Sequence, residues 1–190
     1  SIDFSSPALE GLPSIEECSR RIRERLSIRP EVRLGVGVDR MDYTKGIIER
    51  FRSIERLLEL EPRWVGKFSF IQIAAPSRTR IGRYQNFGQE VADLAESINK
   101  RFASDGYQVI HLLNEHHDPA QVFEYFRGVD LCFVSSLHDG MNLVAKEFVA
   151  ARDDERGVLI LSQFTGAARE MVEALIVNPY DADQCAGALQ

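Results

Sequence analysis

The chain has 190 residues, of which 44% are hydrophobic and 27% are charged, and its formal net charge is −6 at pH 7. The composition is ordinary for a globular protein, and the length is enough for one domain with a full core. The acidic balance argues against a nucleic-acid partner or an acidic membrane surface. No apolar run approaches the ~20 residues that span a bilayer, so no membrane segment is expected.

The amino-terminal residues 1–4 have neither the basic nor the apolar region of a signal peptide. The chain does not begin with Met, which indicates a processed product or a piece of a longer protein. Its three cysteines are far apart and show no C-x-x-C spacing, so we expect reduced thiols and a cytoplasmic location.

The first predicted helix follows an extended entry segment. Ser14 and Glu17 have the spacing of a capping box, which predicts a helix start at this point. The helix carries a run of arginines, at positions 20, 21, 23 and 25. Such a run could bind an anion, but a solvated helix face is the more common outcome. We therefore treat residues 1–31 as an entry segment and helix, and residues 32–190 as one domain.

From residue 32 onward, short apolar runs alternate with helical patterns. Strands are predicted at residues 34–38, 68–75, 107–113, 131–134, 158–161 and 174–177. Helices are predicted from residue 47 to Pro62, at 80–103, from Pro119, and at 143–153, 166–171 and 181–189. This alternation, with near-continuous apolar strands, predicts an α/β fold with a doubly wound, Rossmann-like parallel sheet of about six strands.

In such a sheet ligands bind beyond the carboxyl ends of the strands. The most informative loop there is 135–142, which joins the apolar run 129–134 to a helix that begins at Leu143. A helix start presents free N–H groups and a positive dipole end, which suit a phosphate. Asp139 and Glu147 flank this position, and carboxylates suit the hydroxyls of a sugar or ribose. The loop therefore predicts a nucleotide-sugar pocket.

The loop after the first strand, residues 39–46, contains Arg40 and Lys45. Two such cations could neutralise a diphosphate from two sides. The alternative, in which Arg40 pairs with a neighbouring carboxylate of Asp39 or Asp42 on the surface, has equal weight. The Gly35-x-Gly37 pair lacks the third glycine of a dinucleotide fingerprint, which argues against a nicotinamide cofactor.

Three further loops follow predicted strands. Residues 75–80 include Arg78, which could meet a second anion, although solvated arginines are favoured for this loop taken alone. The histidine-containing loop 114–118 matches no zinc pattern, so we expect backbone contacts with a nucleotide base and no metal site. The small-residue loop 162–168 either packs under the sugar pocket or simply allows close helix–sheet packing, with equal weight.

Together these loops resemble the trehalose-6-phosphate synthases, which are retaining glycosyltransferases of the two-domain GT-B architecture. The resemblance runs from about residue 32 to the end of the chain. It is carried by residues 38–46, 72–78, 139–147, 161–167 and 174–181. The stretch 139–147, which is DGMNLVAKE, is the most specific match. The resemblance implies that the chain is the C-terminal, donor-binding half of a GT-B fold.

The resemblance also implies which residues bind the donor, UDP-glucose. Arg40 and Lys45 would hold its diphosphate and stabilise the charge that develops there during catalysis, together with the backbone amides of Leu143 and Val144. No protein nucleophile, metal ion or cofactor is expected. Arg78 would bind the phosphate of the acceptor, glucose 6-phosphate.

The sugars and the base have their own implied contacts. Glu147 would bind the ribose hydroxyls, and the glucose would be surrounded by Asp139, Gly140, Met141 and Asn142. The backbone at His117 would meet the uracil. The family usually has another aromatic residue at this position, so the histidine is a departure that leaves the base preference open.

The implied reaction transfers glucose from UDP-glucose to glucose 6-phosphate with retention and forms trehalose 6-phosphate. It needs an N-terminal acceptor domain that this chain does not contain, and the family's terminal crossover helix would lie beyond Gln190. The chain by itself is expected to be inactive, and a homo-oligomer is possible. Two alternatives stay open: a glucosylglycerol-phosphate synthase, and a catalytically silent regulatory domain of the same fold.

Overall fold

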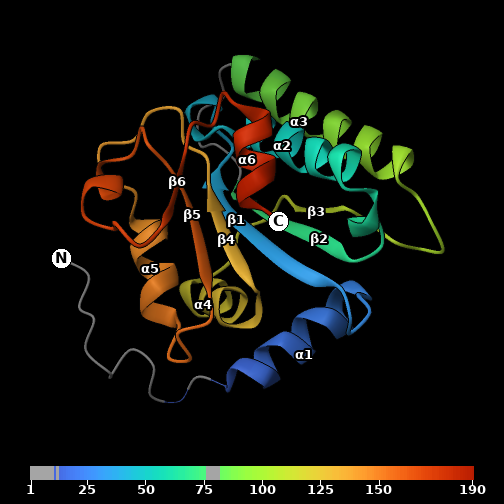
Figure 1. The fold of residues 1–190 in the computed structure, drawn as a ribbon, viewed down its shortest axis with the longest axis horizontal. Coiled ribbons are helices and arrows are strands. Elements are labelled where there is room, and N and C mark those ends of the chain that lie inside the picture. The colour runs from blue at the N-terminus through green and yellow to red at the C-terminus, as the bar shows by residue number, and fades with distance from the viewer. Residues whose placement is uncertain (1–10, 12, 76–81) are drawn as a thin grey trace.

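The computed structural model describes residues 11, 13–75 and 82–190, with side chains from residue 86 onward in the last range, and a six-stranded sheet forms its centre (Figure 1). The strands are β1 (Arg33–Arg40), β2 (Phe68–Ala75), β3 (Ile110–Leu113), β4 (Leu131–Val134), β5 (Val158–Ser162) and β6 (Leu175–Val177). Their order is β3-β2-β1-β4-β5-β6, and every pairing is parallel. This is the doubly wound order, so the predicted fold class is confirmed.

Helices cover both faces of the sheet (Figure 1). They are α1 (Ile15–Leu26), α2 (Ile47–Leu60), α3 (Gly82–Arg101), α4 (Pro119–Gly128), α5 (Leu143–Ala151) and α6 (Ala182–Ala188), with three 3-10 turns, η2 (Tyr43–Lys45), η3 (Pro62–Trp64) and η4 (Gly166–Arg169). Helices α2, α3 and α6 pack on one face, and α4 and α5 pack on the other, with α1 against α4. None of the described helices is both long and apolar enough to cross a membrane.

Strand β1 divides its side chains between the two core layers. Leu34 and Val36 are fully buried in the layer under α4 and α5. Gly35 and Gly37 alternate with them and face α2, because successive strand residues point to opposite faces. The same alternation puts Asp39 on the α2 side and Arg40 on the side of α5.

Most element boundaries differ from the predicted ones by one to three residues, and those of β3 and α5 have a clear physical cause. The strand expected at 107–113 begins only at Ile110, because Asp105 and Gly106 adopt positive φ angles of 44° and 76° and form a turn before it. The helix expected at 143–153 ends at Ala151. Arg152 leaves the helix and its guanidinium donates hydrogen bonds to backbone carbonyls, among them that of Val129 at 2.6 Å.

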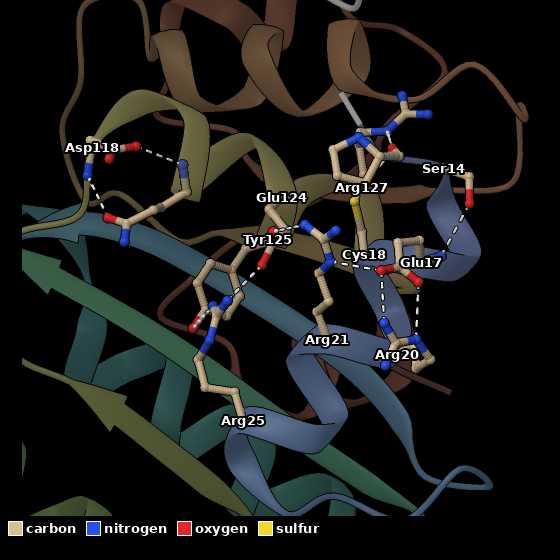
Figure 2. A network of polar contacts seen from close by, with 12 residues as sticks. Ser14, Glu17, Cys18, Arg20, Arg21, Arg25, Asp118, Glu124, Tyr125 and Arg127 are labelled. Atoms are coloured by element: carbon tan, nitrogen blue, oxygen red, sulfur yellow. Dashed lines mark hydrogen bonds and ion pairs between the residues drawn. The ribbon is translucent and has the colours of Figure 1, made fainter. Parts of the chain in front are cut away.

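Helix α1 docks on α4 through the arginines that the sequence singled out (Figure 2). Arg25 donates to Glu124 at 2.8 Å and to the hydroxyl of Tyr125 at 3.2 Å. Arg20 and Arg21 both bind Glu17, and these hydrogen bonds lower the pKa of Glu17 to about 2. These arginines therefore serve ion pairs within and between helices, and the favoured interpretation of a solvated face agrees with the structure.

The contact between α1 and α4 depends on a glycine. A Cβ atom at Gly128 would lie 2.4 Å from Cδ1 of Ile22 and 2.9 Å from the backbone carbonyl carbon of Cys18. We expect Gly128→Ala to lower the free energy of unfolding by about 1–3 kcal/mol, because α1 must move away from α4. Urea denaturation followed by circular dichroism measures this change.

The matched control is Gly187→Ala, since Gly187 also lies in a helix but a Cβ atom added there would meet no atom within 4 Å. There the helix preference of Ala dominates, and the free energy of unfolding should stay the same or rise by up to about 1 kcal/mol. Equal losses in the two variants would contradict the close approach of α1 and α4.

Candidate functional site

The candidate site lies where the strand order reverses, between β1 and β4. In doubly wound sheets this switch point opens a crevice at the carboxyl ends of the strands. The loops that follow β1 and β4 are joined there. The amide of Leu137 donates to the carbonyl of Thr44 at 2.8 Å, and the hydroxyl of Ser135 donates to the carbonyl of Gly46 at 2.7 Å. The two loops therefore form one unit.

Gly46 makes this junction possible. Its φ of 65° lies in the left-handed region, where it ends η2 and precedes α2. A Cβ atom at this position would lie only 2.0 Å from the carbonyl oxygen of Ser135. Both the backbone angle and the close contact thus require glycine, which places Lys45 at the junction of the two loops.

Lys45 and Asp139, which were predicted to bind different parts of one ligand, form an ion pair across this junction. The Nζ–Oδ2 distance is 2.7 Å, and both side chains are largely buried. Asp139 also accepts hydrogen bonds from the amide of Met141 and the side chain of Asn142, both at 3.2 Å. Burial opposes ionisation of Asp139, but these hydrogen bonds outweigh it and hold its pKa below the usual value.

Arg40 is exposed at the end of β1. The carboxylate of Asp39 binds Arg50 at 2.6 Å, and that of Asp42 accepts from the amide and hydroxyl of Thr44, both at 2.9 Å. In the described part of the chain neither carboxylate pairs with Arg40, so the surface pairing that the sequence left open is not the arrangement found. Arg40 is exposed, and the alternation of side chains along β1 assigns it to the side of the sheet where α5 lies.

The start of α5 has the features of an anion site. Asn142 caps the helix, and its Oδ1 accepts from the amide of Ala145 at 3.0 Å. The amides of Leu143 and Val144 come first in the helix and have no intrahelical acceptor. Among the described residues no other group accepts from them. Two N–H groups and the positive end of the helix dipole are therefore available at this point.

Asn142 itself is buried and adopts a φ of 73°, which is uncommon for a residue with a side chain. One end of its side-chain amide caps α5, and the other end donates to Asp139. The side chain thus orients two neighbouring features of the site, and it is turned into the protein.

The loop after β5 is joined to the loop 139–141 by backbone hydrogen bonds. The amide of Gly166 donates to the carbonyl of Asp139 at 3.0 Å, and that of Ala167 donates to the carbonyl of Met141 at 2.8 Å. A Cβ atom at Gly166 would lie 2.0 Å from the carbonyl oxygen of Gly140. Of the two roles that the sequence left open for this loop, packing beneath the predicted sugar contacts is the one that agrees with these hydrogen bonds.

Gly140 is not crowded by neighbouring atoms, in contrast to Gly166. A Cβ atom there would meet no atom within 4 Å, and the neighbouring side chain of Met141 is 51% exposed. Packing within the described protein therefore does not explain why this position is glycine. Gly140 directly follows Asp139, the residue that pairs with Lys45.

Glu147 lies one turn into α5 and is half-buried. Burial raises the pKa of its carboxyl group. No hydrogen-bond donor or cation within the described residues contacts it. A half-buried carboxylate without a partner is costly, and hydroxyl groups of a ligand would satisfy it.

The loop that precedes α4 contains His117, whose side chain is turned into the protein. Its Nδ1 lies 3.2 Å from the carbonyl oxygen of Glu115, and its ring meets the edge of Tyr125 at a centroid distance of 5.7 Å. Asp118 forms a capping box with Gln121 at the start of α4. The backbone of this loop is therefore the part that could meet a base.

Arg78 and the rest of the loop 76–81 lie outside the described residues, so the structure says nothing about the predicted acceptor phosphate site. Within the residues whose side chains are described, no group of three His, Cys, Asp or Glu residues could hold a metal ion. The three cysteines are free and buried, and burial raises the pKa of Cys132 to about 12.

A hollow of about 810 Å³ lies at the other end of the strands, beside α1 and the amino ends of β1 and β4. Arginines line it, but several are already paired with carboxylates: Arg33 with Asp130 at 2.8 Å, and Arg152 with Asp154 at 2.9 Å. None of the residues predicted to bind the donor lines this hollow, so its size does not make it the candidate site.

Trehalose-phosphate synthases are among the curated proteins that this chain resembles. The trehalose-6-phosphate synthase of Klebsiella pneumoniae is 48% identical over 153 residues, which are 80% of this chain and 32% of that protein. The UDP-forming alpha,alpha-trehalose-phosphate synthase A of Dictyostelium discoideum is 38% identical over 91% of this chain and 24% of its own length. The chain thus spans about a third or less of the curated relatives it matches.

Solved structures show the same fold. The UDP-forming alpha,alpha-trehalose-phosphate synthase of Burkholderia xenovorans, in complex with glucose-6-phosphate, matches with a TM-score of 0.84 and 40% identity, over 92% of this chain and 40% of that one. An E. coli protein bound with UDP-2-fluoro glucose matches with a TM-score of 0.83 and 41% identity, over 92% and 40%. The model of glycosyltransferase family 20 matches residues 8–190. The chain belongs to glycosyltransferase family 20.

Proposed function

We propose that the protein containing this chain transfers glucose from UDP-glucose to glucose 6-phosphate with retention, and so forms trehalose 6-phosphate and UDP. The observation that carries the proposal is the convergence of Lys45, Asp139 and the start of α5 at the β1–β4 switch point. The relatives support it, because their names specify a UDP-forming trehalose-phosphate synthase and two are solved with glucose-6-phosphate or a UDP-glucose analogue.

The diphosphate of the donor would lie between Arg40, Lys45 and the first amides of α5. As the bond between glucose and the diphosphate breaks, negative charge grows on the diphosphate. Two cations and a helix start held in place before the reaction stabilise this charge without reorganising. When the diphosphate binds, it would share Lys45 with Asp139 and release that carboxylate toward the glucose hydroxyls.

The glucose would lie beside Gly140 and Met141, where the surface is open, and Glu147 would accept from the ribose hydroxyls. The backbone near His117 would contact the base. Arg78 would bind the phosphate of the acceptor. An N-terminal domain would supply the rest of the acceptor site, in keeping with relatives about three times as long as the matched region. The proposal includes no resident metal or cofactor.

The decisive experiment is product analysis with the full-length natural protein, meaning this chain with any sequence that accompanies it. UDP-[14C]glucose is supplied with glucose 6-phosphate, and the products are separated and identified. Labelled trehalose 6-phosphate is the expected product. Release of labelled glucose with no disaccharide phosphate, at any acceptor concentration, would overturn the proposal.

Arg40→Ala and Lys45→Ala should each lower kcat by about 10²–10³-fold, because each removes about 2.7–4 kcal/mol of charge stabilisation at the leaving diphosphate. Steady-state kinetics of the full-length protein measure the effect. Arg63→Ala is the control, since Arg63 is an exposed arginine in η3, paired only with Glu61 among the described residues. Control-like kinetics in both site variants would refute their assignment to the diphosphate.

Gly140→Ala and Gly166→Ala should separate binding from stability. The methyl group of Gly140→Ala enters open space, so the free energy of unfolding should change by no more than about 0.5 kcal/mol while the KM for UDP-glucose rises. Gly166→Ala drives its methyl group into the backbone of Gly140 and should cost about 1–3 kcal/mol of stability. An unchanged KM for UDP-glucose in Gly140→Ala would contradict the placement of the glucose beside Gly140.

Binding of uridine should weaken on acidification, because Glu147 must be ionised to accept from the ribose and burial raises its pKa above the usual value for glutamate. Uridine carries no phosphate that titrates in this range. NMR titrations from pH 7 to pH 4 measure the affinity, and Glu147→Gln should bind weakly at every pH. An affinity that is constant down to pH 4.5 would contradict the ribose contact.

The raised pKa of Glu147 also affects the free energy of unfolding. A carboxyl group whose pKa is raised by folding stabilises the folded state below its unfolded pKa, and this contribution is lost as the pH rises through the folded value. Glu147→Gln should therefore be at least as stable as the wild type at pH 7, which separates its binding defect from misfolding.

A further inference from the structure

Arg50 is fully buried between α2 and the sheet, directly behind the candidate site. Its Nη1 donates to Oδ2 of Asp39 and to Oε1 of Gln72, both at 2.6 Å. Its guanidinium lies 6.0 Å from the ring centre of Phe70 and 5.7 Å from that of Phe133. A charged side chain thus lies in the core, between two buried polar partners and two aromatic rings.

Stability alone does not explain this arrangement. Nε and Nη2 of Arg50 are buried and have no hydrogen-bond partner in the part of the chain that the structure describes. A Cβ atom at Gly37 would lie 2.3 Å from Nη1, so the strand gives up a side chain to make room for the guanidinium. Buried ion pairs often contribute no more stability than well-packed apolar residues of similar size. A role in placing neighbouring groups accounts for the charge better.

The contacts of Arg50 hold both ends of one loop. Its side chain binds Asp39 at the end of β1. Its backbone amide donates to the carbonyl of Gly46 at 2.9 Å, where α2 begins, in a helical hydrogen bond that any residue except proline would make. Arg40 and Lys45 lie between these two points. Gln72 of β2 also donates to Asp39, at 3.2 Å, and so fixes the same carboxylate from the neighbouring strand.

Clamping Asp39 also determines the direction of Arg40. The two residues are adjacent at the end of a strand, so their side chains point to opposite faces of the sheet. With Asp39 held on the α2 side, Arg40 must project on the side of α5. Without this clamp the last residues of β1 could rotate and turn Arg40 away from the helix start.

We propose that Arg50 is a positioning residue for the diphosphate site: it acts from within the core, through Asp39 and the loop 40–46, and does not touch the ligand. The inference rests on the proposed donor site and adds a residue that the loop patterns did not select. It implies that Arg50 matters for ligands with a diphosphate and not for the nucleoside alone.

The test compares UDP with uridine on the full-length natural protein. UDP affinity is measured by calorimetry and uridine affinity by NMR titration, for wild type, Arg50→Met and Arg50→Lys. Met keeps an unbranched, flexible side chain but removes the charge. Lys retains the charge but lacks the guanidinium whose Nη1 binds both Asp39 and Gln72. Circular dichroism and thermal melting define a temperature at which every variant compared is folded.

Arg127→Met is the matched control, because Arg127 is also a buried arginine but binds the carbonyl of Ala151 at 2.8 Å and Asp153, away from the candidate site. We expect Arg50→Met to weaken UDP binding at least tenfold and uridine binding less than twofold, with Arg50→Lys between the two. Arg127→Met should leave both affinities within twofold of wild type.

The possible results separate the inference from the function. Wild-type UDP affinity in folded Arg50→Met or Arg50→Lys overturns the positioning role and leaves the donor site standing. Equal losses for UDP and uridine also overturn it, because they indicate general damage. If Arg50→Met does not fold, Arg50→Lys decides by the same criteria. If the wild type binds no UDP, both the proposed function and the inference fail.

Discussion

The structure depends on the direct pairing of β1 with β4 in a parallel sheet, which makes the loops after these strands neighbours. Once adjacent, the loops are fastened by backbone and hydroxyl hydrogen bonds, at Thr44 with Leu137 and at Gly46 with Ser135. The charged pair of Lys45 with Asp139 then closes the junction. Residues that lie 94 positions apart thereby form one site, and the rest of the fold holds that junction still.

Two carboxylates in this site have opposite electrostatic environments. Asp139 is held ionised by a lysine, an amide and a side-chain donor, so its pKa falls despite partial burial. Glu147 has only burial acting on it, and its pKa rises. The first is a group already oriented by the protein, whereas the second has no partner among the described residues. The protein therefore orients the carboxylate of Asp139 through Lys45, whereas it leaves the carboxylate of Glu147 open to groups from outside the described residues.

Three glycines and a buried arginine determine how closely the loops of the candidate site pack against the core. Gly46 and Gly166 allow backbone contacts that any side chain would block, and Gly37 leaves room for Arg50. At these three positions the core lacks a side chain, and the loops can approach each other more closely in return. Such a loss of packing is common where function and stability compete. Gly140 differs, because a Cβ atom there would meet no atom within 4 Å, so packing within the described protein does not require glycine.

The sequence alone determined the fold class, the order of the elements and the loops that would carry the site, because apolar periodicity and small-residue turns are local patterns. It also predicted two cations and two carboxylates for the site, and it showed the resemblance to the family that the comparisons confirm. Only the tertiary structure decided that Lys45 pairs with Asp139, that Asn142 turns inward, and that Arg50 stands behind the site. These are contacts between distant segments, and no local pattern encodes which of several possible partners a charged side chain will meet.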